Sequence, residues 1–249
     1  RLSTKWRVSW PARFRRGHLE RLESRQLLTV TSSFVAGTLN VSSDAADDIA
    51  IVNDGVNVLI SVNGAAGINP GGGPAVAANT VTSVQINGFT GDFDNNVDLS
   101  GMIPTLFTAM NDINVDAGGG NDTTVLANSL NTTLGQTYAD AVLVASSISI
   151  TSTGGGAIRF LSTIDSDGAP HSLFVNTTGT VELGDGGADY IGSVNPLSGF
   201  STLNTTQTIF NVADTAQPTV TTTGGQAHTG AMVLANDVVF TSNGFVLFS

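Results

Sequence analysis

Few side chains in this sequence are suited to catalysis. The chain has three histidines and no cysteine, so thiol chemistry and disulfide bonds are both unavailable. The histidines, His18, His171 and His228, lie outside any nucleophile motif. Asp165 and Asp167 are two residues apart, and an inverting glycoside hydrolase needs only two carboxylates. Such a pair is more commonly part of a solvated loop, and we therefore expect no catalytic site.

Acidic, glycine-rich turns are the remaining candidate sites. The segment Ala117–Asp122 (AGGGND) resembles the turn of calcium-binding nonapeptide repeats, and Gly184–Ile191 and Gly91–Leu99 are more degenerate copies. In that family glycines permit the tight turn, while aspartates and backbone carbonyls supply hard oxygen ligands. The candidate calcium ligands implied by the resemblance are Asp92, Asp94, Asp98, Asp116, Asp122, Asp185 and Asp189.

These copies depart from the family's pattern in two ways. Family sites form between consecutive turns, whereas the copies here are isolated, and Ala117 replaces the first glycine. The alternative interpretation is that the Asp and Asn residues only shape solvated turns. Calcium therefore stays one of two hypotheses, and no other cofactor is expected.

Charge is distributed unevenly along the chain. Eight of the nine basic residues lie in the first 25 positions, and Arg159 is the only base after them. Residues 26–249 carry 18 of the 20 acidic residues, which gives this body a formal charge of −17. A short basic leader before a long acidic body is typical of an exported protein, and such a body would repel nucleic acid. No apolar run reaches the roughly 18 residues that a transmembrane helix needs.

The basic head, residues 1–28, ends in the segment Leu22–Leu28 (LESRQLL). This segment resembles the LEPR-XLL tag of planctomycete-type surface proteins, with Ser24 in place of the usual proline. The matching residues are Leu22, Glu23, Arg25, Leu27 and Leu28. The resemblance implies an exported, extracellular or cell-surface protein. The low apolar content of the head and the spread of its arginines predict that it is disordered or helical. The alternative is an unrelated basic leader. Because the sequence begins with Arg1, we expect part of the N-terminus to be missing.

From Leu28 onward, apolar residues alternate with small polar ones. Examples are Ile49–Val52, Asn57–Val62, Ser147–Thr151 and Ser172–Asn176. This period of two predicts strands that bury one face and expose Thr, Ser and Asn on the other. The strands are separated by dipeptides that supply the positive φ of tight turns, namely Asp54-Gly55, Asn63-Gly64, Asn87-Gly88 and Asn243-Gly244.

One internal repeat is visible. Residues 135–152 recur as residues 225–242, with the apolar positions in the same phase. Both copies resemble the strand repeats of filamentous-haemagglutinin-like bacterial adhesins. Gln136 and Tyr138 match that pattern, whereas His228 replaces the tyrosine in the second copy. Recurring strand units at long spacing predict a solenoid or an array.

We therefore predict an all-β protein with a right-handed parallel β-helix (β-solenoid), and antiparallel β-sandwich modules are the alternative. The predicted domains are a basic export head over 1–28, a strand region with acidic turns over 29–130 and adhesin-like repeats over 131–249. A solenoid pairs each strand in parallel with one roughly 20–30 residues away, whereas a sandwich pairs neighbours through hairpins. Either fold buries Val142, Val144, Ile148 and Ile150 in the first repeat, and Met232, Leu234, Val238 and Phe240 in the second.

The predicted function is that of a non-enzymatic, adhesin-like or structural protein. Its long polar faces would contact cell-surface or extracellular polysaccharide or protein. The alternative is a β-helical carbohydrate-active enzyme, a polysaccharide lyase or hydrolase. A lyase would need Arg or Lys beside carboxylate-bound calcium, and the body offers only Arg159. The apolar run Phe245–Phe248 would leave an exposed strand edge, from which we expect that more repeats follow.

Overall fold

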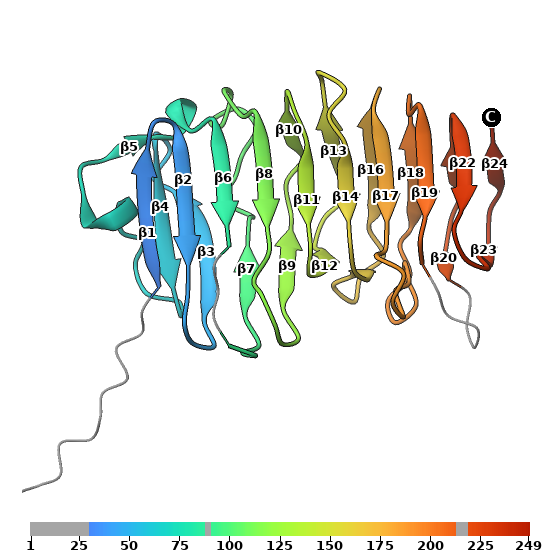
Figure 1. Cartoon of the computed structure of the whole chain (residues 1–249), viewed down its shortest axis with the longest axis horizontal. Helices are drawn as coiled ribbons and strands as arrows, with labels where there is room; N and C mark the ends of the chain where they lie inside the picture. Colours follow the sequence, from blue (N-terminus) through green and yellow to red (C-terminus); the bar gives the residue numbers. More distant parts are fainter. Residues whose placement is uncertain (1–29, 88–90, 213–218) are drawn as a thin grey trace, which may run out of the picture.

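The structure is a computed structural model that describes residues 30–87, 91–212 and 219–249 (Figure 1). Over these ranges the protein is all-β, with parallel and mixed sheets and two short 3-10 turns, η1 (Pro70–Gly72) and η2 (Ala78–Thr80). Within the same ranges no helix is long and apolar enough to span a membrane. The basic head, its LEPR-XLL-like segment and Gly88 of the Asn87-Gly88 turn lie outside the described residues.

The strands form three main sheets. The long sheet contains, in spatial order, β1 (Thr31–Val35), β2 (Thr38–Ser42), β6 (Ser83–Ile86), β8 (Asp112–Val115), β11 (Gln136–Tyr138), β14 (Ile158–Phe160), β17 (Thr180–Leu183), β19 (Gln207–Phe210) and β22 (Ala231–Leu234). The six-stranded sheet contains β10 (Leu130–Thr132), β13 (Ile148–Ser152), β16 (Ser172–Thr177), β18 (Gly199–Leu203), β21 (Gln226–His228) and β24 (Val246–Phe248).

The seven-stranded sheet contains β15 (Ile164–Ser166), β12 (Ala141–Val144), β9 (Thr123–Leu126), β7 (Asn96–Asp98), β3 (Asp48–Asn53), β4 (Asn57–Val62) and β5 (Val76–Ala77). Single bridges through Ile191 connect its β15 end to a two-stranded pair, β20 (Val220–Thr222) and β23 (Phe240–Ser242). The chain thus visits the sheets in turn and comes back to each one strand further along (Figure 1). We call one such passage a rung.

Strand pairing is parallel from β6 to the C-terminal strand β24. Along this stretch paired residues are separated by as few as 18 positions, for Thr123 with Ala141, and as many as 29, for Ser83 with Asp112. Short corner turns pass the chain to another sheet instead of reversing it, so neighbouring strands in sequence do not pair. The antiparallel pairing that a β-sandwich requires is therefore absent from the described part of residues 131–249.

Antiparallel pairs occur at the N-terminal end. They join β1 with β2, β3 with β4, and β4 with β5. The predicted Asp54-Gly55 turn makes the β3–β4 hairpin, where Gly55 has a φ of 94° that suits glycine. The boundary proposed between residues 130 and 131 falls inside β10, and the long sheet continues across it through the β8–β11 pair.

The core lies between the sheets and is filled by alternate residues of each strand. In the first repeat Val142, Val144, Ile148 and Ile150 are all buried, as predicted. In the second repeat the prediction was wrong for Leu234, which is 52% exposed, and Met232, Val238 and Phe240 are only partly buried. These residues belong to the last rung, where no following strand covers the interior.

The two sequence repeats occupy different sheets. The first copy supplies β11 to the long sheet, whereas the equivalent strand of the second copy, β21, belongs to the six-stranded sheet. The next pair, β12 and β22, is likewise split between the seven-stranded and the long sheet. The 90-residue period therefore does not correspond to a whole number of rungs.

Candidate functional site

Polar side chains form a continuous row on the outer face of the long sheet. Burial alternates along β2, β6 and β8, so that every second side chain points to solvent. Because the strands are in register, these outward residues line up from rung to rung. The central row is Asn40, Gln85, Asn114, Thr137, Arg159 and Glu182. It becomes apolar only at Ile209 and Val233, near the C-terminal end.

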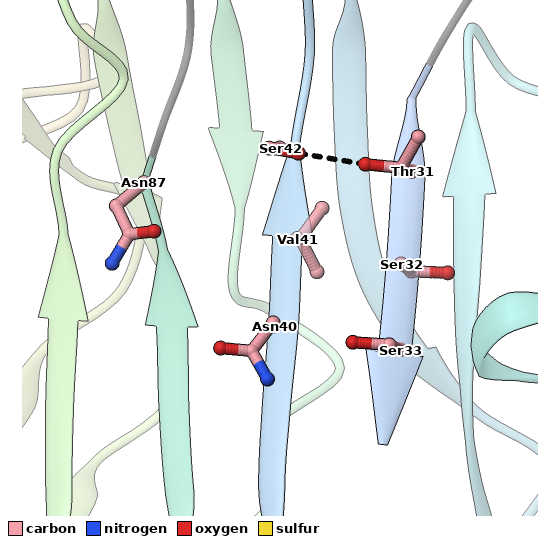
Figure 2. A pocket seen from close by; sticks show the side chains of 7 residues that line it. All are labelled: Thr31, Ser32, Ser33, Asn40, Val41, Ser42 and Asn87. Atoms are coloured by element: carbon pink, nitrogen blue, oxygen red, sulfur yellow. Dashed lines mark hydrogen bonds between the residues drawn. The ribbon is translucent and has the colours of Figure 1, made fainter. Parts of the chain in front are cut away.

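A shallow pocket of about 280 Å³ opens on this face, where β1, β2 and the end of β6 meet (Figure 2). Its lining residues are Thr31, Ser32, Ser33, Asn40, Val41, Ser42 and Asn87. The hydroxyls of Thr31 and Ser42 bond to each other at 2.7 Å. Figure 2 shows the amides of Asn40 and Asn87 on neighbouring strands. Each amide carries two donors and an acceptor, so this pocket presents both donors and acceptors of hydrogen bonds.

Further along the face, one carboxylate oxygen accepts two hydrogen bonds from its neighbours. The Oδ2 atom of Asp112 accepts hydrogen bonds from the Ser83 hydroxyl at 2.8 Å and from the Gln85 amide at 2.7 Å. Arg159 and Glu182 form an exposed ion pair, with Nε and Oε2 3.0 Å apart. The two charges of the central row, Arg159 and Glu182, are thus paired with each other, and the rest of the row presents amides and a hydroxyl.

A second polar row runs along a corner, directly before the strands of the seven-stranded sheet. The register of β3, β7, β9 and β12 places the preceding residues, Asp47, Asn95, Asp122 and Asp140, at the same position of successive rungs. Hydrogen bonds connect the first three. The Asp47 backbone N–H donates to Asn95 Oδ1 at 3.0 Å, and the Asn95 backbone N–H donates to Asp122 Oδ1 at 2.7 Å. We call these four residues the corner row.

Two carboxylates of the corner row are adjacent. Asp122 is only 5% exposed, and its Oδ2 atom has no hydrogen-bond partner within the described ranges. Asp140 is partly buried and accepts the Ala117 backbone N–H at 2.7 Å through Oδ2. Burial, assisted by the negative charges of Asp122 and Asp116, raises the pKa of Asp140 to about 6. Sequence reasoning missed Asp140, because it lies outside the glycine-rich turns.

The other predicted calcium ligands are spread over several rungs and mostly bond to their own turns. Asp98 Oδ1 accepts Ser100 N–H at 2.7 Å, and Asp116 Oδ1 accepts Gly118 N–H at 3.1 Å. Asp94 Oδ1 reaches the next rung, where it accepts Asn121 N–H at 2.8 Å. Asp92 is exposed and forms a backbone bridge to the same turn.

The Gly184–Ile191 turn lies further along the molecule. Asp189 Oδ2 accepts Asp185 N–H at 3.0 Å, and Asp185 Oδ1 accepts Gly187 N–H at 2.9 Å. Burial and the Asp185 charge raise the pKa of Asp189. Among the described residues, no three His, Cys, Asp or Glu side chains come together as a metal-binding group. The seven predicted ligands therefore do not form one site. Among them, Asp122 has a buried carboxylate oxygen without a hydrogen-bond partner in the described ranges.

The carboxylate pair Asp165 and Asp167 supports the structure of a loop. Asp165 Oδ1 accepts the backbone N–H groups of Val194 at 3.2 Å and Asn195 at 3.1 Å, and burial raises its pKa. Asp167 lies 3.1 Å from His171 Nε2. Both acids thus bond to neighbouring parts of the chain.

Comparison of the chain with protein-family models, with curated proteins and with solved structures found no match. The functional assignment therefore depends on the residues and geometry described above.

Proposed function

We propose that this chain is a non-enzymatic, exported cell-surface or extracellular protein of adhesin-like or structural type. Its body would be a right-handed parallel β-helix, since parallel strands joined by crossovers wind with that hand in nearly all proteins. The observation that carries the proposal is the polar row on the long sheet, which places an amide, a hydroxyl or a locally paired charge on six successive rungs.

A repetitive polar face fits a repetitive ligand. Adjacent rungs are about 4.8 Å apart, so one extended polymer could contact several outward side chains at once. Each contact is weak, but several along one chain raise the overall affinity. The body's formal charge of −17 opposes an acidic polymer, so a neutral polysaccharide is the partner we favour over an anionic one. A protein surface is the other partner class.

The charge pattern of the whole chain supports the location. The basic head precedes a body that has one basic residue and no cysteine, a composition that suits export to an oxidising surface without disulfides. The resemblance of the head to an LEPR-XLL tag agrees with export. A fusion of residues 1–28 to a reporter protein would test this part directly, and a reporter that stays inside the cell would contradict it.

Binding and turnover can be measured in one experiment. The purified chain is incubated with insoluble neutral polysaccharides, and bound protein and released oligosaccharides are both quantified. We expect retention without release. The double variant Asn40→Ala/Asn114→Ala should weaken retention, whereas Asn131→Ala, which alters an exposed residue of the six-stranded sheet, should not.

Other outcomes would point elsewhere. Released oligosaccharides would favour the carbohydrate-active enzyme. Retention that is equal in all variants would remove the polar row as the binding face, and no retention by any neutral polysaccharide would leave a protein partner.

A further inference from the structure

We propose that Asp122 and Asp140 bind a hard divalent cation of the calcium class between two neighbouring rungs. The proposal concerns the corner row and is independent of the polar face on the long sheet. It also differs from the set of ligands expected from the glycine-rich turns, because it joins Asp122 to a residue of the next rung.

The two acids occupy the same position of neighbouring rungs. Because Thr123 pairs with Ala141, Asp122 and Asp140, which directly precede these residues, are neighbours in the corner before β9 and β12. Residues at equivalent positions of adjacent strands are about 5 Å apart, and like charges placed there repel each other. Within the described ranges the only Lys or Arg side chain is that of Arg159, and it is paired with Glu182.

Within the part of the chain that the structure describes, one carboxylate oxygen of Asp122 receives both available hydrogen bonds and the other receives none. Two donors of Asn95, its backbone N–H at 2.7 Å and its side-chain amide at 3.1 Å, both bond to Oδ1. The buried Oδ2 atom has no partner within the described ranges. A buried carboxylate oxygen without a donor is costly, and a cation would satisfy it.

Asp47, in the same corner row, differs from Asp122. Asp47 is as deeply buried as Asp122, but both of its oxygens are engaged. The Ser43 hydroxyl donates to Asp47 Oδ2, and the Asn63 amide donates to Oδ1 at 2.8 Å. The corner row can therefore hold a buried aspartate without a metal where donors are supplied. At Asp122 they are supplied to one oxygen only.

The chemistry of the available groups selects the ion. The donors are carboxylate oxygens, with Asp116 contributing negative charge nearby, and hard oxygen donors are what calcium and magnesium bind. Calcium accepts irregular sets of six to eight oxygens, including water, whereas magnesium demands near-ideal octahedral geometry. The partial exposure of Asp140 leaves room for water ligands. With two carboxylates we expect a Kd on the order of 10⁻⁴ to 10⁻³ M, as in extracellular calcium modules.

The test uses the purified full chain after treatment with a chelator. Calcium chloride and magnesium chloride are titrated at equal ionic strength, and binding is followed by calorimetry. We expect one site, whose affinity for calcium is at least about tenfold higher than its affinity for magnesium. Asp122→Asn and Asp140→Asn should each weaken calcium binding by about tenfold or more. Asp98→Asn and Asp185→Asn, whose carboxylates bond to backbone N–H groups of their own turns, are the controls and should leave calcium binding unchanged.

A thermal measurement gives a second readout. Without calcium, Asp140→Asn should raise the unfolding midpoint, because it removes one of two repelling carboxylates and keeps an acceptor for Ala117. With saturating calcium the unfolding midpoint of the parent chain should become the higher of the two, because only the parent chain gains stability from the ion. The proposal is overturned if calcium and magnesium bind alike, if the controls lose binding to the same extent, or if Asp140→Asn shifts the midpoint equally with and without calcium.

Discussion

Two glutamines at equivalent positions of the repeat show how single residues hold this fold together. Gln136 is fully buried, and its Nε2 atom donates to Thr132 Oγ1 at 3.1 Å and to the Thr151 carbonyl at 3.0 Å. Ninety residues later, Gln226 Nε2 donates to Thr222 Oγ1 at 3.2 Å and to the Thr241 carbonyl at 2.9 Å. The same side chain thus joins the same strands of the repeat in two places.

The partners of the amide oxygens differ between the two copies. The Tyr138 hydroxyl donates to Gln136 Oε1 at 2.7 Å, whereas His228 occupies the tyrosine position in the second copy. There Gln226 Oε1 and His228 Nε2 are both buried without partners in the described part of the chain. The sequence marked these glutamines only as a repeat signature. Their burial could not be predicted from alternation, which expects apolar residues inside.

We predict that Gln136→Leu lowers the free energy of unfolding by about 2–4 kcal/mol, although leucine is the more apolar residue. The substitution leaves the buried Tyr138 hydroxyl without its acceptor and removes the donor to the Thr132 hydroxyl and the Thr151 carbonyl, and losses of this kind at buried groups carry such a penalty. Denaturant unfolding measures the change. Thr137→Val, which alters the outward neighbour on the same strand, is the control and should stay within about 0.5 kcal/mol. A neutral Gln136→Leu would contradict the network.

His228 should make the stability of the protein depend on pH. Burial among aromatic rings, including Phe200 and Phe210, lowers its pKa to about 4 from an ordinary value of 6.5. Above pH 6.5 the histidine is neutral in both the folded and the unfolded state. Between pH 6.5 and 4 the unfolded state binds a proton that the folded state does not, so stability falls as pH falls, by up to about 3 kcal/mol.

The contribution of His228 is measured by difference, because buried carboxylates titrate in the same range with the opposite sign. The free energy of unfolding is determined at pH 7 and pH 5 for the parent chain and for His228→Tyr. The parent should lose about 2 kcal/mol more than the variant. At pH 7 the variant should stay within about 1 kcal/mol of the parent, since a hydroxyl that can donate to Gln226 offsets the loss of the 3.0 Å hydrogen bond between Thr202 Oγ1 and His228 Nδ1. Equal losses in both proteins would exclude this role for His228.

At the scale of elements, alternation placed most strands correctly but left their pairing open. The predicted segments Ile49–Val52 and Ser172–Asn176 lie within β3 and β16, and Asn57–Val62 is β4. Alternation is a local signal, and it is the same in a parallel and an antiparallel sheet. The pairing partner is set by how far the chain travels through the corner turns, a distance that no single segment encodes.

The corner turns also explain why the candidate site was only partly predicted. The segment that contains Asp122 resembles a calcium-binding turn, whereas Tyr138-Ala139-Asp140 contains no glycine and carries no such signal. Only the register of β9 with β12 brings the two acids together. A similar reason applies to the polar row on the long sheet. Its members are ordinary Asn, Gln and Thr residues until the rungs align them.

One strand provides a direct test of inward and outward positions. Ile150 in β13 is fully buried, and the neighbouring Ser149 faces outward. Ile150→Asp places a carboxylate in the core without a partner, and we expect a loss of several kcal/mol or failure to fold. Ser149→Asp should change stability by about 0.5 kcal/mol or less. Circular dichroism and denaturant unfolding of both variants measure the contrast. Equal effects at the two positions would contradict the observed burial of β13.

At the scale of the whole molecule, the two ends of the stack of rungs differ. Antiparallel hairpins and η1 lie at the N-terminal end, whereas β22, β23 and β24 each pair on one side only (Figure 1). The burial of apolar side chains also differs between the two ends. Seven of the 14 exposed large apolar side chains in the described ranges lie between Val233 and Phe248. An unpaired strand edge with apolar side chains is a template for association.

The last prediction is that a polypeptide of residues 1–249 associates with itself through this edge. Sedimentation velocity of the parent chain should show a dimer or larger species that increases with concentration and persists at high salt, because apolar contacts and backbone hydrogen bonds are little screened. Val246→Lys/Phe248→Lys puts charges on side chains of β24 that point toward the open end of the core, a device by which natural sheets block edge pairing. This variant should stay monomeric. Val194→Lys, at a loop residue that is 73% exposed, is the control and should associate as the parent does. Association that disappears with added salt would instead assign it to attraction between the basic head and the acidic body.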